Sequence, residues 1–220
     1  MESWDPIWDN VFANQEWGKY PSESLIQFIA RNYYKANRPR VKILEVGCGT
    51  GANIWFISRE GFDTYGIDAS KVAIDIAVSR LQREGLSASL SIGDISILPY
   101  EDNFFDAVID NQCLYTNNQE NTRRILQEIR RVLKPQGKLY SRTFSDKMYL
   151  GKTYDEIGLL EFNNVSDGPL SGKGFIRLSN KASIHDIYGS VFTIESIDSL
   201  DYTSHNEQIH ISDYVILAVK

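Results

Sequence analysis

The sequence predicts an α/β fold with a doubly wound, mostly parallel sheet of seven strands, an antiparallel C-terminal hairpin and helices on both faces. From residue 41 to residue 144, short β-branched and apolar runs alternate with segments whose apolar residues recur at helical spacing. This alternation is typical of parallel strands joined by right-handed helical crossovers. From residue 192 onward, two β-rich segments follow each other without room for a crossover helix, so they are expected to pair as a hairpin.

The N-terminal part of the chain contains two predicted helices and two predicted strands. A helix is expected over 22–35, because Ser22 can cap it and its apolar residues form one stripe. The first strand is expected over 41–46, directly before a cluster of glycines. A second helix over 53–60 stops at a glycine, and the second strand follows over 64–68.

The middle of the chain continues the same alternation. Apolar residues at helical spacing predict a helix over 71–84, and alternating serines and apolar residues predict the third strand over 87–93. The fourth strand is expected over 104–109 and is followed by a helix over 121–133. A turn of sequence Lys-Pro-Gln-Gly then leads into the fifth strand, over 137–144.

We expect one domain over residues 1–220, with a helical cap over 1–36 and an insertion over 145–178. The insertion is rich in Gly, Asn, Ser and Asp, with aromatic residues between them. Long loops in compact domains are usually functional covers or disordered segments, so the insertion is either a substrate cover or a flexible surface excursion. A helix over 179–189 and the hairpin strands, 192–202 and 209–219, complete the chain.

The composition excludes several kinds of protein. No apolar run is long enough to cross a bilayer, and the start of the sequence lacks the pattern of a secretory signal. The two cysteines, Cys48 and Cys113, favour a reducing compartment over a disulfide or zinc framework, so we expect a cytoplasmic protein without a metal site. The net charge of −6 disfavours a nucleic-acid partner. The oligomeric state is not predicted.

The stretch Val41–Gly51, which reads VKILEVGCGTG, is the most informative part of the sequence. Its three glycines allow a sharp turn after the first strand and leave room for a ligand. The spacing of Gly47, Gly49 and Ala52 also satisfies the loose dinucleotide fingerprint. Glu45, two residues before the first glycine, favours a cationic ligand over a pyrophosphate.

This stretch resembles motif I of the class I S-adenosylmethionine-dependent methyltransferases. The resemblance implies that Glu45 faces the amino end of the cofactor's methionine and that the glycines pass under its ribose and methionine. Asp68, at the end of the second strand, is placed to accept both ribose hydroxyls. Asp94 resembles the acidic residue that contacts adenine in this family, with Ile95 against the ring. The C-terminal hairpin is also typical of the family.

Two further motifs extend the resemblance, which is firm over about 22–138. The fourth strand resembles the family's Phe-Asp-x-Val motif, and Leu133–Gly137 resembles its Leu-x-Pro-Gly-Gly turn, with Gln136 in place of a glycine and little consequence expected. Asn111 is either a contact of the reacting methyl group or a strand cap. Trp17 and Tyr20 belong to an aromatic segment that either covers the sulfonium or plugs the first helix. The implied cofactor-binding residues are Trp17, Tyr20, Glu45, Gly47, Cys48, Gly49, Gly51, Asp68, Ala69, Asp94, Ile95 and Asn111.

The predicted reaction is transfer of a methyl group from S-adenosylmethionine to an oxygen or nitrogen of a small molecule. Positioning and desolvation can supply most of the catalysis, so a base is optional. Tyr115 and His185 are the candidate catalytic residues, although a surface histidine is equally compatible with the pattern. Arg142 and Arg177 are either partners for an acidic acceptor or ordinary solvent-facing arginines.

The sequence disfavours specialised nucleic-acid acceptors and leaves two other functions as alternatives. The segment after the fourth strand, DNQC, lacks the prolines typical of enzymes that methylate adenine or the carbon of cytosine, so Cys113 is expected to pack. A non-catalytic relative that binds the cofactor to sense it or to recruit a partner remains an alternative. A nicotinamide-dependent oxidoreductase is a further alternative, and the predicted hairpin speaks against it.

Overall fold

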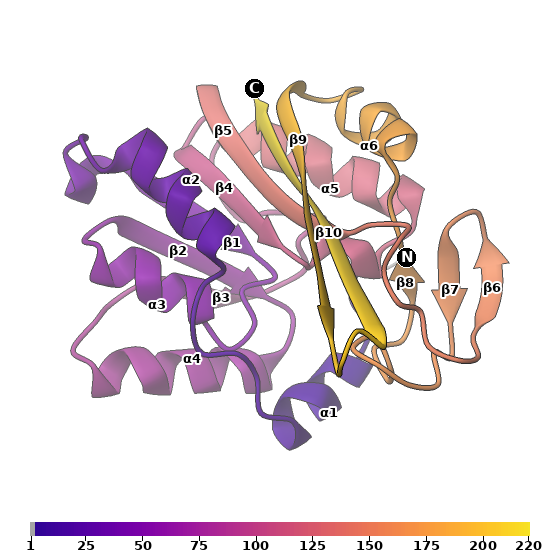
Figure 1. The fold of residues 1–220 in the computed structure, drawn as a ribbon. Helices are drawn as coiled ribbons and strands as arrows, with labels where there is room; N and C mark the ends of the chain where they lie inside the picture. The colour runs from indigo at the N-terminus through magenta and orange to yellow at the C-terminus, as the bar shows by residue number, and fades with distance from the viewer. Residues whose placement is uncertain (1–2) are drawn as a thin grey trace.

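A computed structural model describes residues 3–220, and its main feature is a sheet with the strand order β3-β2-β1-β4-β5-β10-β9 (Figure 1). Strands β3 to β5 in this order pair in parallel, whereas β10 runs antiparallel to both β5 and β9. The predicted fold class is therefore confirmed, and the last strand lies between two earlier ones. The strands are β1 (Lys42–Val46), β2 (Asp63–Asp68), β3 (Ser89–Ile92), β4 (Phe105–Asn111), β5 (Leu133–Phe144), β9 (Thr193–Ser204) and β10 (Ile209–Val219).

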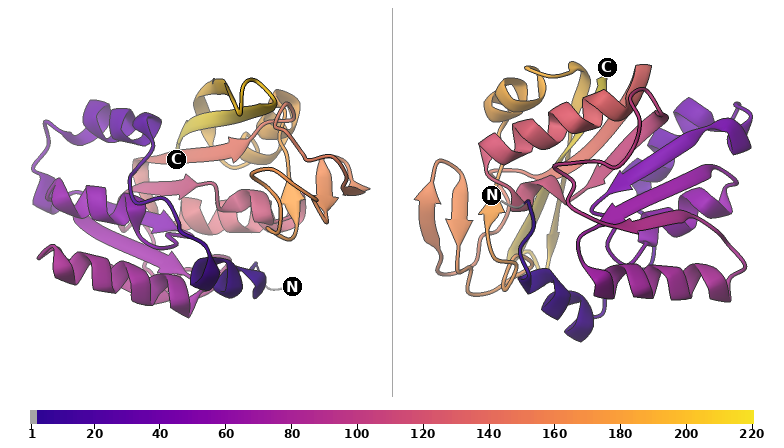
Figure 2. Two further views of the ribbon diagram at one scale, coloured as in Figure 1. Left: turned by 60° about the horizontal axis from the view of Figure 1, so that its bottom comes forward. Right: turned by 180° about the vertical axis from the view of Figure 1, so that it is seen from behind.

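Helices cover both faces of this sheet (Figure 2). Alternate residues of β1 show how the two faces are filled: Ile43 packs in a core with α2 and α3, while Leu44 packs in a core with α5 and α6. The period of two along a strand therefore divides the apolar residues between two layers. The helices are α1 (Ile7–Asn14), α2 (Glu23–Tyr33), α3 (Ala52–Arg59), α4 (Lys71–Arg83), α5 (Gln119–Val132) and α6 (Lys181–Tyr188).

Polar side chains cap the starts of several helices, and the cap predicted at Ser22 is confirmed. Ser22 begins α2 by accepting a hydrogen bond from the Leu25 amide. Ser70 caps α4 and Asn118 caps α5 in the same way. These side chains satisfy amide groups that lack partners at the first turn of a helix, so local sequence fixes where each helix starts.

Residues 145–178 correct the prediction of an irregular loop. They contain a small antiparallel sheet in the order β6-β7-β8, which lies beside the main sheet (Figure 1). The strands of this small sheet are β6 (Asp155–Gly158), β7 (Glu161–Asn163) and β8 (Ile176–Arg177). Its buried apolar residues, among them Phe162 and Leu170, pack with Tyr115 and Phe144 of the main body. Apolar burial therefore organises a segment whose composition resembles that of a loop.

The connection between α5 and β5 also differs from its prediction. The turn that was expected at 134–137 belongs to the beginning of β5, and Gln136 has a φ of 64°. This left-handed conformation is unfavourable for a residue with a Cβ atom. The expectation that a glutamine here has little consequence is therefore wrong, because Gln136 holds a conformation that glycine adopts without strain.

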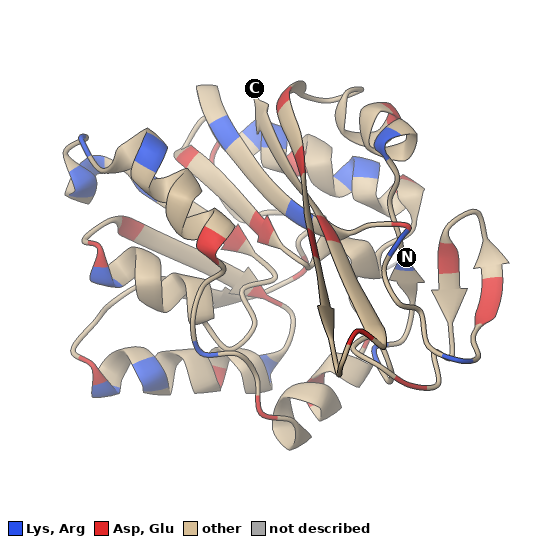
Figure 3. Ribbon diagram, in the orientation of Figure 1, with Lys and Arg blue, Asp and Glu red and all other residues tan. Residues whose placement is uncertain are grey.

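The helices and the distribution of charged residues bear on function. Within 3–220, none of the helices combines the length and the apolar character needed to cross a membrane. Lys and Arg residues are distributed over several helices and strands, with Asp and Glu residues among them (Figure 3). Charge alone therefore marks no single binding face on the ribbon.

Candidate functional site

A pocket opens at the carboxyl ends of the parallel strands, where ligands gather in sheets of this kind. It contains about 830 Å³ of empty space, part of which is open to solvent. The glycine loop after β1 and the ends of β2, β3 and β4 contribute its walls. Of the predicted cofactor-binding residues, those that line the pocket are Trp17, Glu45, Gly47, Cys48, Gly49, Asp68, Ala69, Ile95 and Asn111.

Glu45 is the buried carboxylate of this pocket, with 2% of its surface exposed. Its Oε1 accepts a hydrogen bond of 2.6 Å from Asn53 Nδ2, in the first turn of α3. Glu45 Oε2 and Asn53 Oδ1 are buried and have no partner in the described structure. Burial raises the pKa of Glu45 to about 8. Two unsatisfied acceptors side by side call for a ligand that brings N–H groups and positive charge.

Asp68, at the end of β2, fixes the other side of the glycine loop. Its Oδ2 accepts a 2.8 Å hydrogen bond from the Gly49 amide, and its Oδ1 accepts one of 2.8 Å from the Ser70 amide. Burial raises the pKa of Asp68, although these two bonds oppose the shift. Because each carboxylate oxygen has two lone pairs, both oxygens remain able to accept a hydroxyl group.

The glycines of the loop are required by packing as much as by a ligand. Gly47 has a φ of 62°, and a Cβ atom there would lie 2.1 Å from Cys113 Sγ. Gly51 has a φ of 80°, and a Cβ atom there would lie 2.8 Å from the Cβ of Ala77. Gly51 does not line the pocket and instead begins α3. The sequence-based view that all three glycines make room for a ligand is therefore too simple.

The N-terminal segment forms a wall of the pocket that sequence reasoning missed, apart from Trp17. Ser3, Trp4, Asp5, Trp8 and Phe12 line the pocket. The α1 helix is tied to the site through Asp9 Oδ1, which accepts a 2.5 Å hydrogen bond from Ser70 Oγ. Trp8 and Phe12 are four residues apart on one face of α1, which was the available sequence signal, whereas Trp4 precedes this helix.

Asp94 lies beside the pocket but is not part of its lining, in contrast to Gly93 and Ile95. Both of its oxygens accept hydrogen bonds from Ser3, one from the amide and one from the hydroxyl group. Burial opposes ionisation, but the bonds from Ser3 and Ser96 lower the pKa of Asp94. Of the three predicted carboxylates, Glu45 and Asp68 meet in the pocket, whereas Asp94 holds the N-terminal segment.

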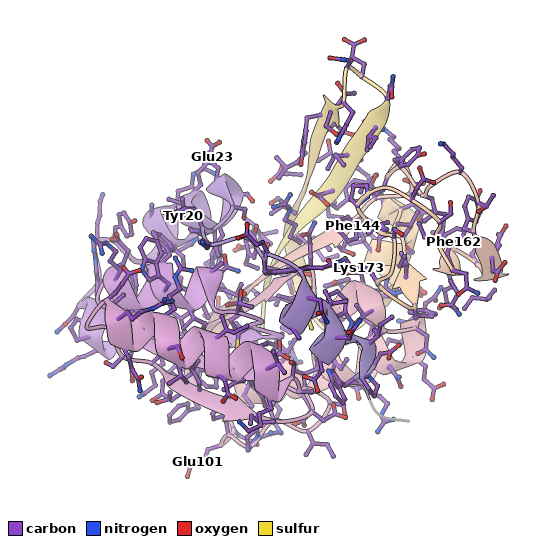
Figure 4. All side chains as sticks on the ribbon, turned by 90° about the horizontal axis from the view of Figure 1, so that it is seen from below. Tyr20, Glu23, Glu101, Phe144, Phe162 and Lys173 are labelled. Carbon is purple, nitrogen blue, oxygen red and sulfur yellow. The ribbon has the colours of Figure 1, made fainter. Side chains whose placement is uncertain are left out.

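Three other predicted site residues lie elsewhere. Tyr20 is 74% exposed and meets the edge of the Trp55 ring, beside α2 and away from the small sheet (Figure 4). Tyr115 is buried against Phe144, and burial raises its pKa, which opposes a role as a base. His185 is exposed on α6. None of these three lines the pocket.

The two arginines have structural partners. Arg142 pairs with buried Asp213 at 2.5 Å. Arg177 is 1% exposed and donates hydrogen bonds to the carbonyl groups of Asn117 and Leu114 and to two hydroxyl groups, those of Thr122 and Ser179. The prediction for Arg177, as a substrate partner or a solvent-facing residue, is therefore wrong, because β8 buries it against the turn that follows β4.

Comparison with known proteins gives a consistent result for the part of the chain around the pocket. Residues 43–137 match a family model described as a methyltransferase domain. A demethylmenaquinone methyltransferase of Tropheryma whipplei is 38% identical over 105 residues, which are 47% of this chain and 42% of that protein. Methyltransferase GfsG of Streptomyces halstedii is 27% identical over 172 residues, covering 76% of this chain and 56% of that protein. The chain thus spans about half the length of these two relatives.

The fold has close structural counterparts. The structure of an S-adenosylmethionine-dependent methyltransferase from Methanosarcina mazei superimposes with a TM-score of 0.73 and 21% identity, over 91% of this chain and 98% of that one. The part of the chain that matches the family model, residues 43–137, includes the glycine loop, the ends of β2, β3 and β4, and Asn111 of the pocket. Residues 43–137 therefore resemble a methyltransferase domain, and the chain has the Rossmann-like fold of the Methanosarcina mazei structure.

Proposed function

We propose that this protein is an S-adenosylmethionine-dependent methyltransferase that methylates an oxygen or nitrogen atom of a small molecule. The observation that carries the proposal is the unsatisfied pair Glu45 Oε2 and Asn53 Oδ1, buried in a pocket beside the glycine loop. A cationic amino group would satisfy both acceptors at once. The curated relatives with methyltransferase names, which this chain resembles in part, support the same reaction class.

The chain's own residues would hold the cofactor from three sides. Glu45 and Asn53 would accept hydrogen bonds from its amino group, Asp68 would accept its ribose hydroxyls, and Ile95 would pack against its adenine. Trp4 Nε1, a buried donor without a partner, is available to an acceptor atom of the same molecule. Bound in this way, the cofactor supplies a methyl group on positively charged sulfur.

Catalysis would then depend on position and on the exclusion of water. The α1 helix lines the pocket with Trp8 and Phe12, and Lys173 contacts the Trp8 and Trp17 rings, so we propose its segment, 145–178, as a substrate cover within a single 1–220 domain. Neither Tyr115 nor His185 is assigned a role, because neither lines the pocket. We also place the protein in the cytoplasm, where reducing conditions suit its two free cysteines.

The direct test is a calorimetric titration with S-adenosylhomocysteine, followed by a turnover assay with S-adenosylmethionine and a broad set of small acceptors. We expect one saturable binding event and release of S-adenosylhomocysteine on turnover. Absence of binding would reject the proposal. Binding without turnover for any acceptor would favour a cofactor sensor, and binding of reduced nicotinamide dinucleotide instead would favour an oxidoreductase.

A further inference from the structure

We propose that the methyl acceptor is the nitrogen of an amine and that Asn111 is the residue that orients it. This inference rests on the proposed methyltransferase function and narrows its acceptor from oxygen or nitrogen to nitrogen. Three features of the described pocket lead to it: the sign of its charges, its aromatic wall and one unsatisfied amide oxygen.

The ionisable side chains that line the pocket are acidic. The ionisable carboxylates of its lining are Asp5, Glu45 and Asp68, and within residues 3–220 its lining includes no Lys, Arg or His. Glu45 and Asp68 are assigned to the cofactor, which leaves Asp5 to face an acceptor, and a carboxylate or phenolate acceptor would find no cationic side chain in the lining. A group that carries or develops positive charge would be attracted instead.

The aromatic wall, which consists of Trp8, Phe12 and Trp17, favours positive charge as well. The ring centres of these residues lie 5.3 to 5.9 Å from one another. Lys173, from the small-sheet segment, already places its ammonium group 4.7 Å from the Trp17 ring and 5.7 Å from the Trp8 ring (Figure 4). The faces of indole rings attract cations, and the contact with Lys173 shows that this wall favours positive charge.

Asn111 supplies the directional contact. It is the last residue of β4, and its Oδ1 is buried, without a partner, in the lining of the pocket. An amide oxygen accepts hydrogen bonds and is not a base. An N–H of a primary or secondary amine would satisfy it while the nitrogen lone pair stays free to react. An alcohol would have to lose its proton during the reaction, and Asn111 cannot take it.

The transfer step balances without a further co-reactant. An amine that binds as an ammonium ion first releases a proton to water. The lone pair of the neutral amine then forms the new N–C bond as the C–S bond breaks, and the electron pair of the C–S bond stays on sulfur. The nitrogen becomes positively charged and then releases a proton to water. The carboxylates and the aromatic wall face this developing charge and stabilise it.

The first test compares three ligands that share one ring and differ in head group: benzylamine, benzyl alcohol and benzoate. Each is titrated into the protein saturated with S-adenosylhomocysteine, and binding is followed by tryptophan fluorescence, since three tryptophans line the pocket. We expect benzylamine to bind about tenfold more tightly than benzoate, and also more tightly than benzyl alcohol. An equal or reversed order, or no binding of benzylamine, would overturn the inference.

The second test uses a matched pair of variants. Asn111→Asp keeps an acceptor oxygen and Asn111→Leu removes it, so benzylamine affinity is expected to persist in the first and to fall about tenfold in the second. An equal loss in both variants would show that the amide N–H is needed, and retention in Asn111→Leu would show that the oxygen is not needed; either result contradicts the inference. Thr143→Val removes another unpartnered buried oxygen, outside the pocket lining, and should leave benzylamine affinity unchanged.

Calorimetry with S-adenosylhomocysteine accompanies every variant. It gives the concentration that saturates each variant, so that every benzylamine affinity is measured on protein saturated with S-adenosylhomocysteine. Failure of the wild-type protein to bind S-adenosylhomocysteine would reject the proposed function itself, whereas a wrong order of head groups would reject only the amine acceptor.

Discussion

The glycine-loop region and the small-sheet region each bury an ionisable side chain, and they differ in whether the protein supplies all of its hydrogen-bond partners. Glu45 is 2% exposed and keeps one oxygen without a partner. Arg177 is 1% exposed, and its Nε and both Nη atoms donate hydrogen bonds. A buried charge that the protein satisfies itself belongs to the fold, whereas one that it leaves unsatisfied marks the place of a ligand.

Asp110 and Glu45 show the same difference between a satisfied and an unsatisfied carboxylate at one edge of the sheet. It lies on β4 beside β1, where its register partner is Val46, and it is fully buried. Its oxygens accept hydrogen bonds from the amides of Cys113 and Leu114 and from the hydroxyl group of Ser141. An acidic residue near a strand end is therefore not sufficient evidence of a site, since the satisfied carboxylate of Asp110 anchors a turn.

The largest expected effect is on the small-sheet side of this comparison. Arg177→Met should lower the free energy of unfolding by about 3 kcal/mol or more, because it leaves buried carbonyl groups and the nearby Asp110 carboxylate without their cation. Urea denaturation at pH 7 measures the change. Arg124→Met, at an exposed position of α5, is the matched control and should change stability by less than about 0.5 kcal/mol. A similar small change for Arg177→Met would contradict the structural role.

On the glycine-loop side, Glu45→Gln should stabilise the ligand-free protein by about 3 kcal/mol at pH 7. Because the folded pKa of about 8 lies above the ordinary value of 4.5, the folded state holds a proton that the unfolded state has lost. The wild-type protein therefore loses stability as pH rises from about 4.5 to about 8, and the variant should lack this loss. Denaturation curves across this range measure it.

A change of opposite sign in the free energy of unfolding is expected when the satisfied carboxylate of Asp110 is neutralised. Asp110→Asn places an N–H group among three donors, so it should lower the free energy of unfolding by about 1–3 kcal/mol. If Glu45→Gln and Asp110→Asn changed stability in the same direction, the distinction between an unsatisfied and a satisfied carboxylate would fail.

A smaller gain in stability is expected from a substitution at the start of β5. Gln136→Gly should raise the free energy of unfolding by about 1 kcal/mol, because a φ of 64° costs glycine little. Gly137→Ala should act in the opposite direction, since its Cβ atom would lie 2.8 Å from the Lys134 carbonyl oxygen. Thermal unfolding of both variants measures the changes, and destabilisation by Gln136→Gly would show that its side chain matters more than its backbone.

The smallest effects are expected for Tyr20→Ala and His185→Ala. Both side chains are exposed and lie outside the pocket lining, so the affinity for S-adenosylhomocysteine should change by less than about twofold. Trp17→Ala, within the lining, should weaken binding more than either. Calorimetric titration compares the three variants, and a large loss in Tyr20→Ala would restore the sequence-based view of an aromatic cover at that position.

Local patterns predicted the framework well, because each is set by neighbours in sequence. Ser22 caps the helix that it was expected to cap, and the C-terminal β-rich segments pair as a hairpin. Glu45 and Asp68 follow from the βα order, since parallel strands bring their carboxyl ends to one edge. The central part of the site was therefore accessible from sequence.

The features of the fold and the site that the sequence did not predict depend on contacts between distant parts of the chain. The α1 helix has eight residues, which are too few for stability on its own. A hydrogen bond from Ser70 to its Asp9 helps to hold it in place. Asp94 is turned to Ser3, 91 residues away in sequence, so its family resemblance gave no hint of this partner. Arg177 looked like a surface residue because the partners that bury it are backbone carbonyls, which leave no trace in the sequence.

The central claim is that the unsatisfied carboxylate of Glu45 receives the cationic end of the cofactor. Its most direct test is a calorimetric titration of S-adenosylhomocysteine at pH 7 in two buffers with different ionisation enthalpies. Since the pKa of Glu45 is about 8 without ligand, binding should release about one proton per molecule bound, and the measured enthalpy should differ between buffers. Glu45→Gln should bind more weakly and show no buffer dependence. Equal affinity and equal buffer dependence in the variant would contradict the account.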